Sequence, residues 1–266
     1  MTLPATPRKL GLARSLSKMG FCSRSTAFQL ILAGRVSLNG NLCRNPEAPV
    51  HAGQDRILVD GQLAERSTQT YLMLNKPRGV VTTASDEKGR RTAYDYVKSD
   101  LPWVAPIGRL DRASEGLLLF TNDSEWAARI LAPETHLDKT YHVQISSIAD
   151  QSLLCAMCDG IKAQAGDFLR AKSARLLRKG ERNCWLQIVL DEGKNRHIRR
   201  LLAELGVSTL RLVRVAVGPL ALGDLAKGKI RYLTRQEKKS LNDAMRLASE
   251  KQGLAKVPCA REPYNP

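Results

Sequence analysis

The chain has 266 residues, 43% of them hydrophobic, which is enough for one or two domains with a sizeable core. Lysine and arginine total 42 against 26 acidic residues, so the formal net charge is +16 and the pI is near 9.9. This excess of positive charge indicates a polyanionic partner. No apolar run approaches the ~20 residues of a membrane-spanning helix, and no apolar segment of a secretory signal follows the basic N-terminus. We therefore expect a cytoplasmic protein without a membrane partner.

The sequence lacks the motifs of common cofactor sites. Cys155 and Cys158 form one C-x-x-C pair, but no second pair lies at zinc-ribbon distance, and no H-x-x-H or H-x-x-x-H pair occurs. Residues 223–230 (GDLAKGKI) come close to a phosphate-binding loop, but Ile230 stands where magnesium binding needs serine or threonine. There is no G-x-G-x-x-G. We expect reduced cysteines, no metal and no nucleotide or other cofactor.

Residues 10–34 have the pattern of two short helices. Apolar residues recur at helical spacing from Leu12 until Gly20, which ends the first helix. Ser23 is a candidate N-cap of the second helix, and Gly34 ends it. The apolar positions of the two helices are Leu12, Leu16, Met19, Ala27, Leu30 and Ile31.

The next segment, 35–42 (RVSLNGNL), is predicted to form a β-hairpin. The Asn-Gly dipeptide inside it is the strongest short-range indication of a hairpin turn. We expect Val36, Leu38 and Leu42 to face the same side. A further alternating stretch, 56–61, predicts the strand that closes this module.

Basic residues lie off the apolar positions of this module. Such residues either form a solvated surface or contact a polyanion. The stretch 20–40 (GFCSRSTAFQLILAGRVSLNG) resembles the αL RNA-binding module, first described in a small-subunit ribosomal protein. That family usually has a second basic residue at position 25, where this chain has Ser25. The resemblance implies docking on structured RNA through phosphate contacts. The candidate contacts are Arg14, Lys18, Arg24 and Arg35.

Further elements follow along the chain. Residues 62–70 (QLAERSTQT) are polar and aperiodic, which is typical of a short linker. The apolar run that begins at Tyr71 predicts a strand ending in a turn at Pro77, and the polar segment 85–92 predicts an exposed loop.

A buried strand is predicted over 117–120, followed by a helix that begins at Asn122 or Asp123. Another strand is predicted over 141–145. Two more helices are predicted from their apolar spacing, one with Ile198, Leu201, Leu202 and Leu205 and one with Leu241, Met245 and Leu247.

Asp111 lies on the loop that enters the buried strand, between Arg109 and Arg112. A carboxylate between arginines commonly forms a surface ion pair. The segment 108–123 (GRLDRASEGLLLFTND), however, resembles the active-site segment of the pseudouridine synthases that act on ribosomal RNA. Three further segments resemble that family in the required order: 74–79 (LNKPRG), 139–141 (KTY) and 192–202 (EGKNRHIRRLL).

This resemblance implies an enzyme that converts uridine to pseudouridine. By carry-over onto the matching positions, Asp111 is the catalytic carboxylate and Arg199 its orienting partner. Tyr141 either stacks on the extracted uracil, relays the proton lost from carbon 5, or packs on a strand face. Attack on the base and attack on the sugar both remain open, because both routes need the same residues. The other expected RNA contacts are Lys76, Arg109, Arg112, Lys194, Asn195, Arg196 and Arg200.

We thus expect an α+β protein with an αL RNA-binding module (8–66), a mixed, mainly antiparallel-sheet pseudouridine synthase catalytic domain (70–235) and a helical, basic tail (236–266). The expected function is site-specific uridine isomerisation by a monomer acting on ribosomal RNA or an assembling ribosomal subunit. The alternatives are a synthase acting on transfer RNA and a non-catalytic RNA-binding or ribosome-assembly protein. The tail either attracts RNA or only aids solubility.

Overall fold

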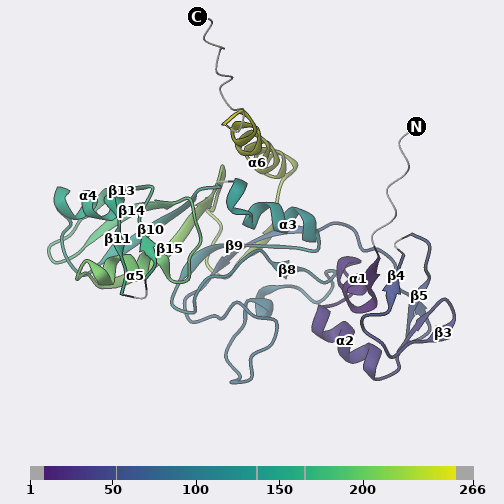
Figure 1. Cartoon of the computed structure of the whole chain (residues 1–266). Coiled ribbons are helices and arrows are strands. Elements are labelled where there is room, and N and C mark those ends of the chain that lie inside the picture. Colours follow the sequence, from purple (N-terminus) through teal and green to yellow (C-terminus); the bar gives the residue numbers. More distant parts are fainter. Residues whose placement is uncertain (1–8, 52, 136, 165, 256–266) are drawn as a thin grey trace, which may run out of the picture. The chain divides into compact units, whose positions relative to one another are not determined.

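The computed structural model describes residues 9–51, 53–135, 137–164 and 166–255, with side chains described up to residue 247 (Figure 1). Contacts divide the chain into two compact units. The first unit consists of the chain up to Leu72 together with Val97–Ile107 and Leu119–Ala127. The second unit consists of Met73–Tyr96, Gly108–Leu118 and the chain from Ala128 on. Among the described residues, no helix is both long and apolar enough to cross a membrane.

The first unit begins with β1 (Leu10–Gly11), α1 (Leu12–Lys18), α2 (Arg24–Leu32), β2 (Val36–Leu38), β3 (Asn41–Leu42), β4 (Pro49–Val50), β5 (Ile57–Val59) and β6 (Gln62–Leu63). Both predicted helices are confirmed. Ser23 caps α2, because its Oγ accepts a hydrogen bond from the Thr26 amide at 2.9 Å. Gly20 and Gly34 follow the two helices with φ of 76° and 72°, a conformation that favours glycine. The core of this unit contains Leu12, Leu16, Ala27, Ile31 and Val36.

The small sheet of the first unit has the strand order β3-β2-β5-β6 and contains two tight hairpin turns. The predicted hairpin between β2 and β3 is confirmed, with φ of 52° at Asn39 and 83° at Gly40. A second turn of the same kind joins β5 to β6, with φ of 50° at Asp60 and 80° at Gly61.

The prediction that Leu42 faces the same side as Val36 and Leu38 was wrong. Leu42 is 62% exposed and lies opposite Ser37 in the hairpin register. A two-residue turn pairs the strands so that the next residue, Cys43, follows the phase of Val36. Cys43 donates its amide to the Val36 carbonyl at 2.9 Å and packs against the core instead.

The segment 62–70, predicted as a linker, is partly ordered by its own contacts. Gln62 and Leu63 form β6, and Ala64 is buried. The Thr70 amide donates to Asn122 Oδ1 at 2.8 Å, and Asn122 Nδ2 donates to the Thr68 carbonyl at 2.9 Å. This part of the chain is therefore fastened within the first unit.

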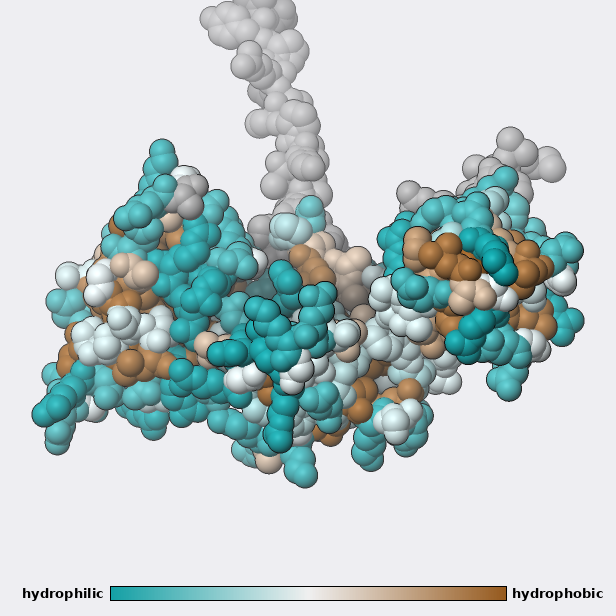
Figure 2. All heavy atoms as spheres, turned by 90° about the horizontal axis from the view of Figure 1, so that it is seen from below, coloured by the Kyte–Doolittle hydropathy of each residue, from teal (hydrophilic) through white to brown (hydrophobic). Residues whose placement is uncertain are grey.

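The surface of the first unit is not uniformly polar. Phe21, Phe28 and Leu32 are between 40% and 47% exposed. Figure 2 shows hydrophobic patches among the hydrophilic residues on the face seen from below. Phe28 and Leu32 lie one turn apart on α2 and therefore share one exposed face of this helix.

The main sheet has the strand order β13-β14-β10-β15-β9-β7-β17, with β16 beside β15 and β8 beside β9 (Figure 1). Its strands are β7 (Tyr71–Lys76), β8 (Ala105–Pro106), β9 (Glu115–Thr121), β10 (Lys139–Ile145), β13 (Ser173–Lys179), β14 (Cys184–Leu190), β15 (Thr209–Val217), β16 (Leu220–Ala221) and β17 (Ile230–Tyr232). β10 pairs antiparallel with β14 and β15, whereas β15 pairs parallel with β9. This mixed, mainly antiparallel sheet confirms the expected α+β class.

The other elements are η1 (Ala93–Tyr96), α3 (Ser124–Leu131), η2 (Pro133–Thr135), α4 (Gln151–Asp159), β11 (Ile161–Lys162), β12 (Phe168–Leu169), α5 (His197–Glu204) and α6 (Arg235–Ala255). Of the two proposed caps of α3, Asp123 is the one observed, because its Oδ1 accepts a hydrogen bond from the Trp126 amide at 3.0 Å. The apolar stripe of α5 is confirmed, since Ile198, Leu201 and Leu202 are buried in one cluster with β10 and β14.

Helix α6 buries only part of its predicted apolar face. Leu241 and Met245 are buried, but Leu247 is 52% exposed, so its place on that face was wrong. Two residues along a helix correspond to about 200° of rotation, which carries Leu247 to the other side. The tail after residue 255 lies outside the described residues.

Gly116 allows β9 to approach β15 closely. A Cβ atom at Gly116 would lie 2.2 Å from the Arg214 carbonyl oxygen, and its φ is +100°. Any side chain there would force the paired backbones apart.

We therefore expect Gly116→Ala to lower the free energy of unfolding by about 3 kcal/mol or more, from the clash and the backbone strain together. The control is Gly89→Ala, since Gly89 also has positive φ, but a Cβ there would meet nothing within 4 Å. This control should cost only about 1 kcal/mol. Urea unfolding measures both, and equal midpoints for the two variants would contradict the close-approach argument.

Candidate active site

Asp111 lies on a tight loop between Gly108 and the start of β9. Its side chain is 34% exposed, so the carboxylate is accessible but not fully solvated. The Ser114 amide donates to the Asp111 carbonyl at 2.9 Å, which closes a turn. The loop can therefore present the carboxylate from a fixed backbone.

Main-chain hydrogen bonds hold this loop from two sides. From the segment after β7, the Gly79 amide donates to the Arg112 carbonyl at 2.7 Å, and Thr82 Oγ1 donates to the Leu110 carbonyl at 2.8 Å. From α5, Arg199 Nη2 donates to the Ala113 carbonyl at 3.1 Å. The main-chain carbonyls of Leu110, Arg112 and Ala113 are thus all anchored.

Two guanidinium groups lie near the carboxylate. Arg196 Nη1 lies 3.6 Å from Asp111 Oδ2, whereas Arg199 contacts the loop backbone. Arg196 precedes α5 with a left-handed φ of 48°, which is uncommon for a residue with a side chain. Burial lowers the pKa of Arg199, as does the neighbouring Arg196, but a guanidinium remains charged at physiological pH. Arg196 therefore pairs with the carboxylate, whereas Arg199 bonds to the loop backbone and also attracts the Asp111 charge.

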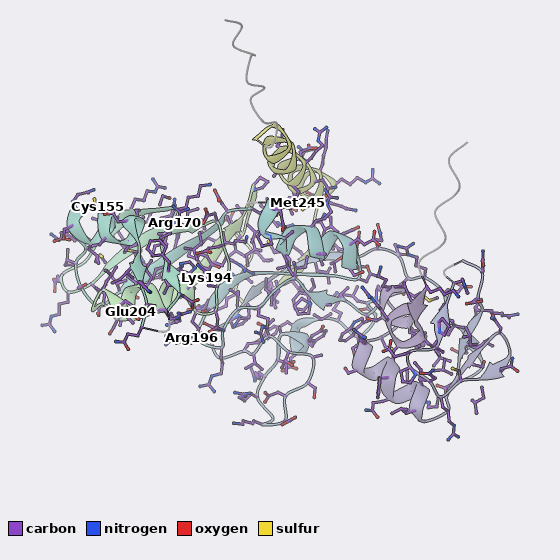
Figure 3. All side chains as sticks on the ribbon, viewed as in Figure 1. Cys155, Arg170, Lys194, Arg196, Glu204 and Met245 are labelled. Atoms are coloured by element: carbon purple, nitrogen blue, oxygen red, sulfur yellow. The ribbon has the colours of Figure 1, made fainter. Side chains whose placement is uncertain are left out.

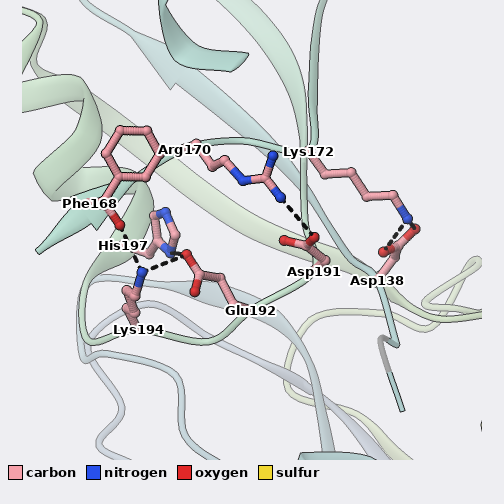
Figure 4. Close-up of polar contacts among 8 residues, drawn as sticks. All are labelled: Asp138, Phe168, Arg170, Lys172, Asp191, Glu192, Lys194 and His197. Atoms are coloured by element: carbon pink, nitrogen blue, oxygen red, sulfur yellow. Dashed lines mark hydrogen bonds and ion pairs between the residues drawn. The ribbon is translucent and has the colours of Figure 1, made fainter. Parts of the chain in front are cut away.

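The segment that carries Lys194 and Arg196 is itself held in place (Figure 4). Lys194 Nζ donates to the Phe168 carbonyl at 2.7 Å and to Glu192 Oε1 at 2.9 Å. Arg170 Nη2 lies 3.6 Å from Asp191 Oδ2. Figure 3 places Lys194 and Arg196 at the end of α5 opposite Glu204.

A cavity of about 760 Å³ opens beside Asp111. A volume of this size is typical of small-molecule sites. Cationic side chains dominate its charged lining: Lys88, Arg90, Arg109, Arg112, Lys194 and Arg196. Asp86 and Glu87 also line it. Hydrogen bonds from Arg90 lower the pKa of Asp86 to about 2, so this carboxylate stays ionised, and its ion pair with Arg90 compensates its charge. The cavity therefore suits an anionic ligand that exposes a group to the Asp111 carboxylate.

The loop that contributes Lys88 and Arg90 was predicted from the sequence only as an exposed segment. Its run of basic residues, K-G-R-R, was the available indication of a role in binding. Thr82 was also missed, because a single threonine in a polar stretch has no distinguishing pattern.

Tyr141 is placed by the sheet register. It pairs with Arg214 on β15, and Arg214 pairs with Gly116 on β9. Two strand spacings correspond to about 10 Å between the backbones of Tyr141 and Gly116. Tyr141 also packs against the buried cluster around β10 and β14.

Lys76 is not a surface RNA contact. It is fully buried, and its Nζ donates to the Val80 carbonyl at 2.7 Å and the Pro77 carbonyl at 3.1 Å. Burial lowers the pKa of Lys76 to about 8. Lys76 therefore organises the turn from which Gly79 reaches the Asp111 loop.

The other predicted RNA contacts form two groups, and Arg200 lies outside both. Arg109, Arg112, Lys194, Asn195 and Arg196 line the cavity. Arg14, Lys18, Arg24 and Arg35 belong to the first unit, where Lys18, Arg24 and Arg35 pair with Glu125, Glu47 and Asp60. Arg200 forms an ion pair with Asp167 at 2.6 Å. Exposed pairs of this kind are weak and exchange readily for phosphate.

Fold and site together define an α+β protein with a small, basic N-terminal module and a carboxylate set in a cationic cavity. Among the described residues, no cluster of three or more His, Cys, Asp or Glu side chains could hold a metal ion. Comparison with known proteins identifies the family. The family model described as RNA pseudouridylate synthase matches residues 70–204, and that of the S4 domain matches residues 10–57.

Relatives share most of this chain. Ribosomal large subunit pseudouridine synthase B of Bacillus subtilis (strain 168) is 36% identical over 86% of this chain and 94% of its own. An uncharacterized RNA pseudouridine synthase of Aquifex aeolicus (strain VF5) is 37% identical over 87% of this chain and 93% of its own. A crystal structure of a pseudouridylate synthase superimposes with a TM-score of 0.62, at 28% identity, over 87% of this chain and 99% of that one. The chain belongs to the RNA pseudouridine synthase family and carries an S4 RNA-binding domain, as the motifs predicted.

Thr82 offers a test of how the Asp111 loop is held. Thr82→Val keeps the shape of the side chain but removes the hydroxyl that bonds to Leu110. Losing this contact should cost about 1 kcal/mol and accelerate amide exchange in residues 108–114 roughly 5-fold. Hydrogen–deuterium exchange with mass spectrometry measures this, and Thr82→Ser should restore the slow exchange. Unchanged exchange in Thr82→Val would show that other contacts suffice.

Lys76 predicts a pH dependence of stability. Its pKa is about 8 in the folded chain, below its ordinary value of 10.5, so the unfolded chain binds more protons between these values. Burial of the charged amine is therefore a penalty below pH 8 that is relieved as the pH rises to 10.5. Relative to Lys76→Met, the wild-type protein should gain about 3 kcal/mol of stability across this window. Urea unfolding of both proteins at several pH values measures this gain. A difference in the free energy of unfolding that stays the same from pH 8 to 10.5 would refute the prediction.

Proposed function

We propose that this enzyme isomerises a specific uridine in ribosomal RNA, with Asp111 as the catalytic carboxylate. The observation that carries the proposal is the position of Asp111: a partly exposed carboxylate on an anchored loop, beside a nucleotide-sized cationic cavity. The extensive similarity to a synthase named for the large ribosomal subunit supports ribosomal RNA as substrate. We extend the proposal to the domain limits 8–66 for RNA binding and 70–235 for catalysis.

The reaction makes few demands on the protein beyond this arrangement. The bond from nitrogen 1 to the ribose breaks, the base turns, and carbon 5 forms the new bond to the same ribose carbon. Carbon 5 then loses its proton, and nitrogen 1 gains one, so the overall reaction is an isomerisation. A carboxylate can serve either as a nucleophile or as a base in this sequence. Arg196, 3.6 Å away, supplies its counter-charge, and the cavity leaves room for the base to turn.

Other residues prepare the RNA for this step. A uridine in folded RNA must first be flipped out, at a cost of a few kcal/mol. Arg109, Arg112 and Lys194 around the cavity are suited to hold the flanking phosphates. We assign Tyr141 to stacking on the extracted base or to proton transfer, and Arg199 to positioning the Asp111 loop.

The S4 domain supports binding to structured RNA outside the cavity. Arg14 is exposed on α1, and Arg24 and Arg35 keep more than half of their side-chain surface exposed despite their ion pairs. Phosphate contacts from these residues would fix the position of the RNA without reading its sequence. The choice of uridine then depends on contacts near the cavity.

We expect Asp111→Asn to abolish pseudouridine formation while RNA binding persists, because the amide is isosteric but neither nucleophilic nor basic. Ribosomal RNA from cells with wild-type or Asp111→Asn protein is mapped by carbodiimide-dependent stops in reverse transcription. One stop should disappear in the variant, and its position identifies the substrate nucleotide.

The control is Glu134→Gln, which also neutralises one carboxylate but belongs to η2, which packs against α6, and does not line the cavity beside Asp111. It should retain the stop. If ribosomal RNA is unchanged by Asp111→Asn, the same assay on transfer RNA distinguishes the second class of substrate. No change in either RNA would favour a non-catalytic RNA-binding protein.

A further inference from the structure

The half of the main sheet formed by β13, β14, β10 and β15 has two unlike faces. Along β14, buried residues alternate with half-exposed ones. Val143 and Leu186 belong to the buried face, together with the apolar side chains of α5. Tyr141 shares the phase of Val143 and therefore belongs to this face as well. The opposite face carries Trp185 and the residues in phase with it.

The strand register aligns this second face into two rows. In the first row, Trp185 lies opposite Gln144 and Arg178, and Gln144 lies opposite Arg211 on β15. The second row contains Arg175, Gln187, His142 and Val213. Each row crosses four strands, which is about 14 Å at the usual strand spacing.

Two arginines flank the Trp185 ring. The Cζ atom of Arg178 lies 4.9 Å from the ring centroid, and that of Arg211 lies 5.5 Å from it. Arg211 is also fixed by Glu115, whose two carboxylate oxygens each accept a hydrogen bond from it at 3.2 Å. Arg178, by contrast, is exposed on the edge strand. One guanidinium is therefore anchored and the other is free to move.

The charge of this face is positive. Its two rows contain three arginines and no acidic residue. The neighbouring Glu115 is buried and already bonded to Arg211 and Lys227, so its charge is compensated. A hollow of about 330 Å³ lies here, lined by residues that include His142, Trp185 and Val213.

We propose that this face, the Trp185 platform (Arg175, Arg178, Trp185, Arg211, Gln144, Gln187, His142 and Val213), binds an unpaired stretch of the substrate RNA. An aromatic ring on an open sheet, with arginines beside it, is a stacking surface for unstacked bases. The arginines bind phosphates. Gln144 donates through Nε2 to Asn183 and Gln187 accepts through Oε1 from Arg175, so the other amide atom of each can bond to a base edge. The inference rests on the chain acting on RNA, and it adds a contact on the sheet face opposite to that of Tyr141.

Direct binding tests the platform. The full-length protein is titrated with a fluorescein-labelled, single-stranded oligouridylate of about 10 nucleotides at low salt. Trp185→Ala should weaken binding roughly 5- to 150-fold, the range of one lost base stack, whereas Trp185→Phe should stay within about 3-fold of wild type. Lys162→Ala, a single-charge control on the exposed strand β11, should bind like wild type.

Arg178→Glu provides a second variant, since Arg178 is exposed and its replacement leaves the core intact. It should weaken binding more than Lys162→Ala does and make the affinity less sensitive to salt. With an RNA substrate, Trp185→Ala should raise KM while kcat at saturation stays unchanged.

Two results would overturn the platform: wild-type affinity of both Trp185→Ala and Arg178→Glu, or equal losses in Trp185→Ala and Lys162→Ala. These results are independent of Asp111. An active Asp111→Asn protein would refute the proposed function, and that protein should bind the oligouridylate normally because its platform is intact.

Discussion

The parallel pairing of β9 with β15 is the contact on which the active site depends. Asp111 lies just before β9, and α5, with Arg196 and Arg199, lies just before β15. Because the two strands run in the same direction side by side, the segments that precede them meet at the same edge of the sheet. Residues far apart in the sequence thus become neighbours. Gly116 permits this pairing, since a side chain there would collide with the Arg214 backbone.

Local chemistry made part of this structure predictable. Caps and turns depend on residues close in sequence, so Ser23, Asn39-Gly40 and the glycines after the helices could be identified. The strand β9 was predictable because both its faces are buried and its apolar run is continuous. The start of α6 at Arg235 lies one residue before the expected helical tail, and Thr234 and Glu237 form a reciprocal capping box there.

Features that depend on tertiary contacts were less accessible. The strands β13 and β15 mix basic and apolar residues, and β14 interrupts its apolar run with Gln187, so their patterns did not indicate strands. Lys76 looked like a surface cation, because no neighbouring residue in the sequence indicates that its amine donates to two carbonyl groups in the interior. The family motif led to Asp111 and Arg199, but only the geometry distinguishes the guanidinium that pairs with the carboxylate from the one that holds the loop.

The Asp111 loop is held by main-chain atoms of its own residues. The carbonyls of Leu110, Arg112 and Ala113 accept the anchoring hydrogen bonds, whereas the side chains of Arg109 and Arg112 are exposed. Carbonyl groups persist through side-chain substitution, so the exposed Arg109 and Arg112 can be replaced while the loop backbone keeps its anchors. Evolution or design can thus change the RNA that these two side chains contact without moving the Asp111 carboxylate.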